Sequence, residues 1–326
     1  MRSVVVAGHV CVDLIPEVPA RAATVPGSLV EVGPLSLSAG GCVANTGGDL
    51  AALGADVEVV ADAGDDELGA VLLALLRARG TRTDQVRLRG GRTTSYSLVF
   101  EGEGQDRSIW HHVGANAEWD GTAVDLTGAR LLHVGYPSLL PALIADGGRP
   151  LEALLARARA AGITTSLDLA VIDPASAAAR EDWPALLGRV LPLVDVFSPS
   201  VDDVRTALRL DQGAELRDMA RMLLALGPAI VLLTAGPAGL QLSTGDAPRL
   251  GAAGGVLEGR AGWSGREHFV PPPRVEVRTT LGAGDAATAG LLFGLVEGLD
   301  PRGTLDLAAR TAAARVAGAP LASALR

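Results

Sequence analysis

The sequence predicts an α/β protein: a three-layer α/β/α sandwich with a mainly parallel central sheet, plus a small β-flap lid. Two observations favour this fold class. Short β-branched runs alternate with Ala- and Leu-rich helical runs along most of the 326 residues, which is typical of right-handed βαβ units. Two segments, about 14–40 and 93–114, break that rhythm with Pro and Gly or with alternating polar and apolar residues, as antiparallel strands do. We expect one domain over 1–326, with these two segments forming the lid.

The expected strands of the central sheet are short apolar runs rich in valine, isoleucine and leucine. They cover residues 4–12, 57–61, 131–134, 163–167, 194–197 and 230–233. The expected helices have apolar residues at helical spacing and mostly end near a glycine. They cover residues 43–53, 65–80, 150–162, 284–298 and 301–318. Residues 245–273 are rich in Gly and Pro, and we expect an irregular excursion with an edge hairpin there.

The composition excludes several classes of function. Cys11 and Cys42 are the only cysteines, so a disulfide framework and a four-thiolate metal site are ruled out. All 28 basic residues are arginine, which rules out Walker-type phosphate loops and lysine-based catalysis. The net charge of −9 argues against nucleic acid as a partner. No stretch has the pattern of a signal peptide or a membrane span, so we expect a cytoplasmic protein.

The sharpest candidate site is Gly282-Ala283-Gly284-Asp285, in front of an apolar helical run. Its amide groups can approach an anion closely, and the positive end of the helix dipole adds to their effect. Asp285 could take a proton from a hydroxyl while these amides stabilise the group being transferred. Ordinary helix capping would also explain the same residues.

Two groups of residues suit the recognition of hydroxyl groups. Gly40, Gly41 and Asn45 open an expected helix, and Asp13 follows the first apolar run. In an open parallel sheet, ligands bind at the carboxyl ends of the strands, where we expect both groups to lie. A glycine-rich turn with a capping Asn, and a turn-forming Asp, are the structural alternatives.

Three more groups follow later strands or the lid. The turn of Thr234, Gly236 and Gly239 suits a nucleotide, and Asp202 or Asp203 could orient hydrated Mg²⁺. A third group runs from His111 and His112 to Asn116. Neighbouring residues of a strand point to opposite faces, so the two histidines cannot both bind one metal ion, and one of them is expected to face the substrate.

These groups, in this order, resemble the ribokinase-like (PfkB) family of carbohydrate kinases over essentially the whole chain. The run from Gly40, Gly41 and Asn45 to residues 64–69 resembles the family's N-terminal signature, and 282–285 resembles its C-terminal one. The resemblance implies phosphorylation of a sugar-like hydroxyl by ATP and Mg²⁺. It assigns Asp285 as general base and the amides of 282–284 as the anion hole.

The resemblance also distributes the remaining roles. The residues expected to bind the acceptor are Asp13, Gly40, Gly41, Asn45, His111, Asn116 and Gly135. The residues expected on the nucleotide side are Ser200, Thr234, Gly236 and Gly239, with Asp203 holding Mg²⁺ through water. A homodimer that pairs through the edges of the lid is expected as well.

The chain departs from the family pattern at three places. Ser200 and Asp203 stand where the family usually has Asn and Glu, so the contact with Mg²⁺ is altered. Thr279 replaces an Asp that often helps to hold an activating monovalent cation, which leaves a requirement for K⁺ open. Asp168-Leu169-Ala170 replaces a common Asp-x-Asn after the central strand, which weakens one contact on the phosphate side.

Three alternatives compete with a sugar kinase. A nucleoside kinase of the same family would need an apolar slot in the lid, which Tyr96, Val99 and Trp110 could supply. A non-catalytic sugar or nucleotide sensor on the same scaffold would explain the departures. A dinucleotide-dependent oxidoreductase is disfavoured, because the residues after the first apolar run, 8–13, do not form Gly-x-Gly-x-x-Gly.

Overall fold

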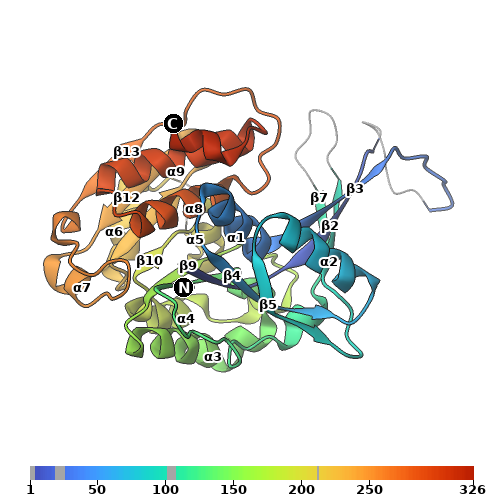
Figure 1. The fold of residues 1–326 in the computed structure, drawn as a ribbon, viewed down its shortest axis with the longest axis horizontal. Coiled ribbons are helices and arrows are strands. Elements are labelled where there is room, and N and C mark those ends of the chain that lie inside the picture. The colour runs from blue at the N-terminus through green and yellow to red at the C-terminus, as the bar shows by residue number, and fades with distance from the viewer. Residues whose placement is uncertain (1–3, 19–25, 101–107, 211–212) are drawn as a thin grey trace.

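The computed structural model describes residues 4–18, 26–100, 108–210 and 213–326 (Figure 1). Within these residues, nine strands form one sheet in the order β13-β12-β11-β10-β9-β8-β1-β4-β5. Neighbouring strands from β5 to β11 are parallel, and β12 and β13 extend the sheet in antiparallel fashion. The strands are β1 Val4–Gly8, β4 Val57–Gly64, β5 Arg82–Arg89, β8 Leu131–Gly135, β9 Thr164–Asp168, β10 Val196–Phe197, β11 Ile230–Thr234, β12 Leu240–Thr244 and β13 Glu267–Val270.

Helices cover both faces of this sheet, which confirms the predicted three-layer arrangement (Figure 1). Alternate residues of β1 belong to different cores: Val4 and Val6 pack on one face, Val5 and Ala7 on the other. The first face is covered by α1 Gly41–Leu53, α2 Glu67–Ala78, α8 Ala283–Val296 and α9 Pro301–Val316. The second is covered by α3 Pro141–Ala160, α4 Trp183–Val190, α5 Val201–Leu208 and α6 Leu216–Ala225. In the described chain, no helix combines the length and the apolar character needed to cross a bilayer.

The lid is a second, four-stranded sheet with the order β3-β2-β6-β7 (Figure 1). Both predicted segments contribute to it: β2 Cys11–Pro16 and β3 Leu35–Gly40 from the first, β6 Tyr96–Phe100 and β7 Ser108–His112 from the second. The turn predicted at 101–106 lies outside the described residues. The prediction of one continuous strand over 4–12 was wrong. Gly8 has φ +127° and packs directly on the Gly135 backbone, so β1 ends there and β2 leaves for the lid.

Two other expectations need adjustment. The helix expected from Pro150 is the second part of α3, because Ala145–Gly148 depart from helical geometry within it. The excursion at 245–273 contains the short helix α7 Ala247–Gly251, and its edge strand β13 pairs with β12 as part of the central sheet. The antiparallel hairpin is therefore formed by β12 and β13, and β12 precedes the segment 245–273 in which the hairpin was expected.

Asp66 joins the helical layer to the base of the lid. Its carboxylate caps α2 by accepting the amide of Gly69 at 2.9 Å, and it also accepts the amide of Thr94 at 2.8 Å. A Cβ on Gly69 would lie 2.1 Å from the carbonyl oxygen of Gly64, so this turn admits only glycine. Residues 64–69, the later part of the N-terminal signature, therefore fix the position at which the second lid segment begins.

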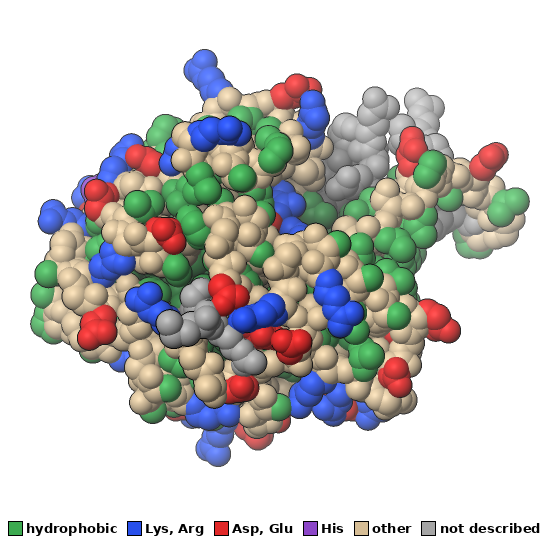
Figure 2. All heavy atoms as spheres, viewed as in Figure 1, with side chains coloured by type: hydrophobic (Ala, Val, Ile, Leu, Met, Phe, Trp, Pro, Cys, Tyr) green, Lys and Arg blue, Asp and Glu red, His purple; other side chains and the backbone are tan. Residues whose placement is uncertain are grey.

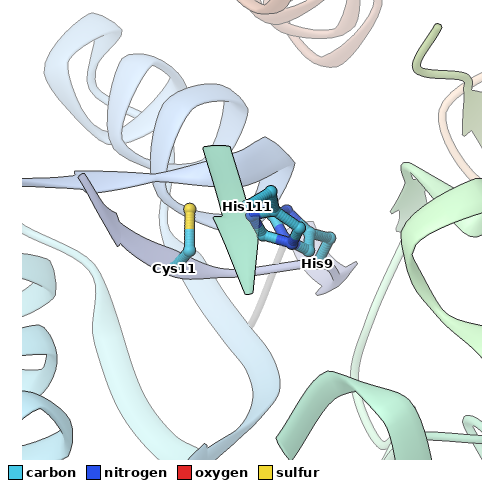
Figure 3. Close-up of side chains that lie close together, drawn as sticks. All are labelled: His9, Cys11 and His111. Atoms are coloured by element: carbon cyan, nitrogen blue, oxygen red, sulfur yellow. The ribbon is translucent and has the colours of Figure 1, made fainter. Parts of the chain in front are cut away.

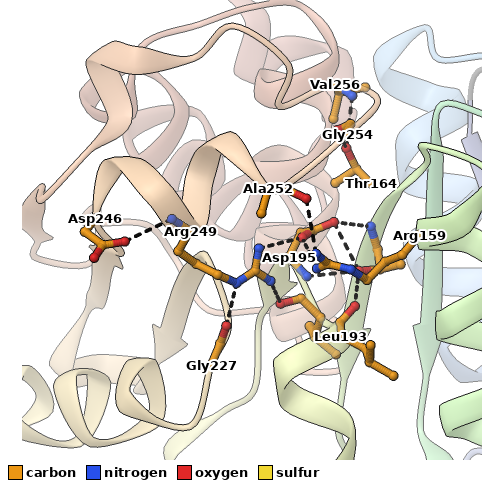
Figure 4. A network of polar contacts seen from close by, with 12 residues as sticks. Arg159, Thr164, Leu193, Asp195, Gly227, Asp246, Arg249, Ala252, Gly254 and Val256 are labelled. Atoms are coloured by element: carbon orange, nitrogen blue, oxygen red, sulfur yellow. Dashed lines mark hydrogen bonds and ion pairs between the residues drawn. The ribbon is translucent and has the colours of Figure 1, made fainter.

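A buried ion-pair network lies at the opposite edge of the sheet (Figure 4). Asp195, directly before β10, accepts Arg159 of α3 at 2.9 Å and Arg249 of α7 at 3.0 Å. Its second oxygen accepts the amide of Thr165 at 3.0 Å. Because these residues lie where the strands begin, the network stabilises the fold at the edge away from the carboxyl ends of the strands.

Candidate active site

Asp285 lies in the first turn of α8, a helix that is buried along almost its whole length. Gly282 caps this helix with φ +73°, a conformation that glycine adopts without strain. The Asp285 side chain is only 3% exposed. Removing a carboxylate from water to this extent requires hydrogen-bond donors around it, and the neighbouring elements supply them.

Three side chains donate hydrogen bonds to Asp285. Asn45 Nδ2 and Tyr136 Oη donate to Oδ2 at 3.1 and 2.7 Å, and Thr46 Oγ1 donates to Oδ1 at 3.0 Å. Burial raises the pKa of Asp285 above its ordinary value, while the bonds from Tyr136, Thr46 and Asn45 act in the opposite direction. The site thus places a carboxylate with raised basicity at the positive end of a helix.

Tyr136 and Thr46 were not predicted from the sequence. Tyr136 follows β8 with φ +62° and ψ +50°, a left-handed conformation that is costly for a residue with a Cβ. This conformation directs the phenol to Asp285 and places its ring 6.0 Å from that of His9. Burial raises the pKa of Tyr136, so it remains a protonated donor. The feature of the sequence that points to this role is the position of the tyrosine, directly after Gly135, where the strand ends.

The expected anion hole adjoins this carboxylate. A Cβ on Gly282 would touch the side-chain amide of Asn45 at 3.6 Å, so the turn lies against Asn45. In this turn the amide of Ala283 approaches the Thr280 carbonyl at 3.4 Å. Thr279 Oγ1 accepts the amide of Leu281 at 3.1 Å and so shapes the turn.

Asp13 lies at the root of the lid on the same side of the sheet. It is buried, and a Cβ on Gly40 would lie 2.1 Å from its Oδ2. Burial raises the pKa of Asp13, hydrogen bonds from Cys11 and Ser97 lower it, and the charge of Asp285 raises it further. The effect of the Asp285 charge on Asp13 indicates that the two carboxylates lie in the same region of the molecule.

A continuous path of contacts connects the two carboxylates. Ser97 and His111 lie side by side on the lid, with 3.2 Å between Oγ and Nδ1. His111 Nε2 is 3.3 Å from His9 Nε2, and His9 stacks on Tyr136, which donates to Asp285. His112 instead contacts Thr93, so the two histidines point to opposite faces as predicted.

Gly41, Asn116 and Gly135 lie behind this path. A Cβ on Gly41 would meet His9 Nδ1 at 2.5 Å, and one on Gly135 would meet Cys42 Sγ at 1.9 Å. Asn116 is fully buried and donates to the Val10 carbonyl at 2.8 Å. The lack of a side chain at Gly41 and Gly135 and the hydrogen bond from the Asn116 side chain thus determine how closely the backbone segments of this region approach one another.

The residues expected on the nucleotide side form a separate group. Ser200, Thr234 and Gly236 line a surface cavity of about 470 Å³ beyond β10 and β11. Gly239, with φ +101°, ends the turn before β12. Ser200 and Asp203 also cap α5 reciprocally: the Ser200 amide donates to Asp203 Oδ2 at 2.8 Å, and the Asp203 amide donates to Ser200 Oγ at 3.1 Å.

Asp168 and Asp203 are buried acids that interact electrostatically with each other and with Asp285. Burial raises the pKa of Asp168 and Asp203, and the charge of Asp285 raises both further. As a set, their oxygens do not come within 4.8 Å of one another, so they do not form a closed metal cage. A hydrated cation near Asp203 would relieve this repulsion, which fits a contact with Mg²⁺ through water.

An ion-pair cluster of Asp49, Arg79 and Arg315 contacts the side chain of Asn45. Arg79 donates to Asn45 Oδ1 at 3.4 Å and to Asp49 Oδ1 at 3.0 Å, and Arg315 of α9 also pairs with Asp49. Burial raises the pKa of Asp49 to about 6, and the charges of Arg315 and Arg79 act in the opposite direction. Asp49 in α1 therefore links this helix to α9 close to Asn45, the residue that contacts Asp285.

The chain matches the family model described as pfkB family carbohydrate kinase over residues 1–322. It is 27% identical over 302 residues to the aminoimidazole riboside kinase of Salmonella typhimurium, covering 90% of this chain and 81% of that protein. The solved structure of Arabidopsis thaliana ribokinase complexed with ribose and ATP has a TM-score of 0.75 at 20% identity, covering 97% of this chain and 92% of that one. The putative ribokinase II from E. coli, in complex with ATP and Mg²⁺, has a TM-score of 0.74 at 18% identity, covering 100% and 96%.

Replacing Asp49 with alanine is expected to lower the free energy of unfolding by about 3 kcal/mol, because it leaves two partly buried guanidinium groups without their partner. Urea unfolding followed by circular dichroism measures this. The control is Asp306→Ala, which breaks an exposed pair with Arg302 on α9 and should cost less than about 1 kcal/mol. Equal effects of the two substitutions would contradict the role given to Asp49.

Proposed function

The chain belongs to the PfkB family of carbohydrate kinases, and we propose that it transfers the γ-phosphoryl group of ATP to a hydroxyl of a sugar or polyol, with residues 1–326 acting as one kinase domain. The observation that carries the proposal is the Asp285 carboxylate, buried at the N-terminus of α8 beside Asn45 and linked by contacts to Asp13. A base beside an anion-binding turn is what phosphoryl transfer to an alcohol requires.

Asp285 acts as the general base in this proposal. Asn45, Thr46 and Tyr136 fix the orientation of the carboxylate, so that an acceptor hydroxyl can approach an oxygen that already points into the site. As the acceptor oxygen bonds to the γ-phosphorus, its proton passes to Asp285 and the bond to ADP breaks. The amides of Gly282, Ala283 and Gly284, with the helix dipole behind them, stabilise the charge on the transferred group.

Asp13 and the lid hold the acceptor. Asp13 can accept hydrogen bonds from sugar hydroxyls, Gly40 allows the backbone to come close to it, and Gly41 allows close packing on His9. His111, on the same face of the lid, can contact the acceptor as well. Covering the site with the lid would exclude water, which otherwise competes as acceptor.

In this proposal, ATP binds beside Ser200, Thr234, Gly236 and Gly239. The cavity there is continuous with the carboxyl end of β11 and large enough for part of a nucleotide. Asp203 is the residue that would contact Mg²⁺ through water. When bound, Mg²⁺ would neutralise phosphate charge.

The register of the lid favours a sugar over a nucleoside. Ser97 pairs with His111, and Asp13 pairs with Ser97, so these three side chains share the inner face. Tyr96 and Trp110 occupy alternate positions and therefore lie on the outer face, away from Asp13. The expectation that Tyr96, Val99 and Trp110 form one slot for a base was wrong, because Val99 pairs with Ile109 on the inner face while the two rings lie on the outer face.

The test of the proposal is the release of ADP from Mg·ATP in the presence of a panel of pentoses, hexoses, inositols and nucleosides, each with and without K⁺. We expect a sugar or polyol to stimulate ADP formation well above the rate without acceptor. If a nucleoside gave the strongest response, this result would favour a nucleoside kinase of the same family. Failure of every acceptor, together with saturable binding of ATP or sugar, would point to a sensor.

Asp285→Asn should reduce kcat by about 10²–10⁴-fold, the range that general bases contribute, and leave acceptor binding nearly unchanged. Because only the ionised carboxyl accepts a proton and burial raises its pKa, kcat/KM of the unaltered enzyme should fall on the acid side at a pH above the ordinary aspartate range. The exposed Asp306→Asn is the control. Near-normal kcat in Asp285→Asn would remove this residue as the base.

We also propose a homodimer that pairs through the lids. The outer face of the lid exposes Leu35, Leu37 and Trp110, which are 57%, 41% and 53% accessible, and hydrophobic side chains gather on the lid side of the molecule (Figure 2). Light scattering should give twice the chain mass, and Trp110→Arg should shift it toward the monomer. Leu299→Arg, at an exposed position outside the lid, should not. A monomeric mass of the unaltered protein at assay concentration would exclude this dimer.

A further inference from the structure

Three potential metal ligands meet where the lid joins the sheet (Figure 3). His9 lies in the short link between β1 and β2, Cys11 begins β2, and His111 comes from β7, about a hundred residues further along the chain. The Nε2 or Nδ1 atoms of the histidines and the Sγ atom of Cys11 all lie within 4.8 Å of one another. Among the described residues, no other group of three or more His, Cys, Asp and Glu side chains has its ligand atoms this close together.

The spacing of the two imidazoles matches a tetrahedral site. Their Nε2 atoms are 3.3 Å apart. Two nitrogen ligands at about 2.05 Å from a tetrahedral Zn²⁺ ion are separated by about 3.3 Å, and a thiolate at about 2.3 Å would lie about 3.6 Å from each. Cys11 Sγ lies within 4.8 Å of a ring nitrogen of each histidine, so it has to move closer by at most about 1.2 Å to reach the tetrahedral spacing.

The charge of the group also suits a divalent ion. The contact between the two rings can satisfy only one N–H group. Asp13 Oδ1 lies 3.3 Å from Cys11 Sγ, so a dication with a Cys11 thiolate and the Asp13 carboxylate gives a neutral site.

His111 is oriented by a neighbour as metal-binding histidines usually are. Its Nδ1 lies 3.2 Å from Ser97 Oγ on the adjacent strand, which leaves Nε2 pointing at His9. Hydrogen bonds of this kind to the second ring nitrogen fix the tautomer that binds a metal.

We propose that His9, Cys11 and His111 bind a borderline-soft divalent metal ion of the Zn²⁺ type, with the fourth coordination position left open. A set of two nitrogens and one sulfur selects Zn²⁺ over Mg²⁺, which prefers oxygen ligands. On binding, the S–H bond of Cys11 breaks, a sulfur–metal bond forms and one proton passes to solvent; no atom is oxidised or reduced. The site is therefore distinct from the one that would serve Mg·ATP.

Such an ion would couple the lid to the sheet. It would join His9, at the end of the central strand β1, to β2 and β7 of the lid, and it would lie between Asp13 and Tyr136. If the proposed function holds, the ion occupies the acceptor pocket, and Zn²⁺ should inhibit in competition with the acceptor. Binding itself does not depend on the proposed function.

The test is a titration of the metal-free full chain with Co²⁺, in the absence of ATP and acceptor. We expect one equivalent to produce visible bands of tetrahedral Co²⁺ and a near-ultraviolet thiolate-to-cobalt band, and Zn²⁺ to abolish both. Cys11→Ser should lose the thiolate band, and His111→Asn should weaken binding by at least about tenfold. Cys42→Ser removes a buried cysteine outside the group and should keep the spectrum.

Circular dichroism of each variant shows whether it is folded. The spectrum of the unaltered chain needs no variant, so it decides the proposal even if a substitution prevents folding. Absence of a thiolate-to-cobalt band in the unaltered chain, or a band that persists in folded Cys11→Ser, would overturn the site. Because neither measurement uses ATP, such a result would leave the proposed kinase activity unaffected.

Discussion

The burial of one carboxylate, Asp285, is the constraint on which the rest of the site depends. An ionised group can be taken out of water only where donors replace the lost hydration. Those donors come from α1 and from the turn after β8, so the first turn of α8 has to lie against both. The packing of α8 against α1 at this point, and with it the position of the turn that we propose binds an anion, follow from this requirement.

The lid shows how strand periodicity decides chemistry. Asp13, Ser97 and His111 face inward because they are in register across β2, β6 and β7, and the aromatic residues one step along face outward. Near Asp13 the inner face is therefore polar, whereas the outer face exposes Leu35, Leu37 and Trp110. In our proposals, one face of the sheet contacts the acceptor and the other contacts a second copy of the chain.

The fold was largely predictable because its core strands are apolar and its helices amphipathic or small-residue rich. β5 was missed because it is a polar edge strand whose arginines pair with Asp62 of β4. The break at Gly8 depends on contact with Gly135, which no local pattern reveals. Asp285 and Asn45 could be located by motif, but Tyr136 reaches the site only through an unusual backbone conformation set by its surroundings.

The attachment of the lid has a mechanical consequence. The Asp66 carboxylate accepts the amide of Thr94 and so fixes the second lid segment to the helical layer, and the Val12 amide donates to the Ser95 carbonyl and so joins β2 to that segment. A sheet that is held at one end bends, and its displacement grows toward the free end. Entry of a small molecule would then depend on the bending of β2 and β6.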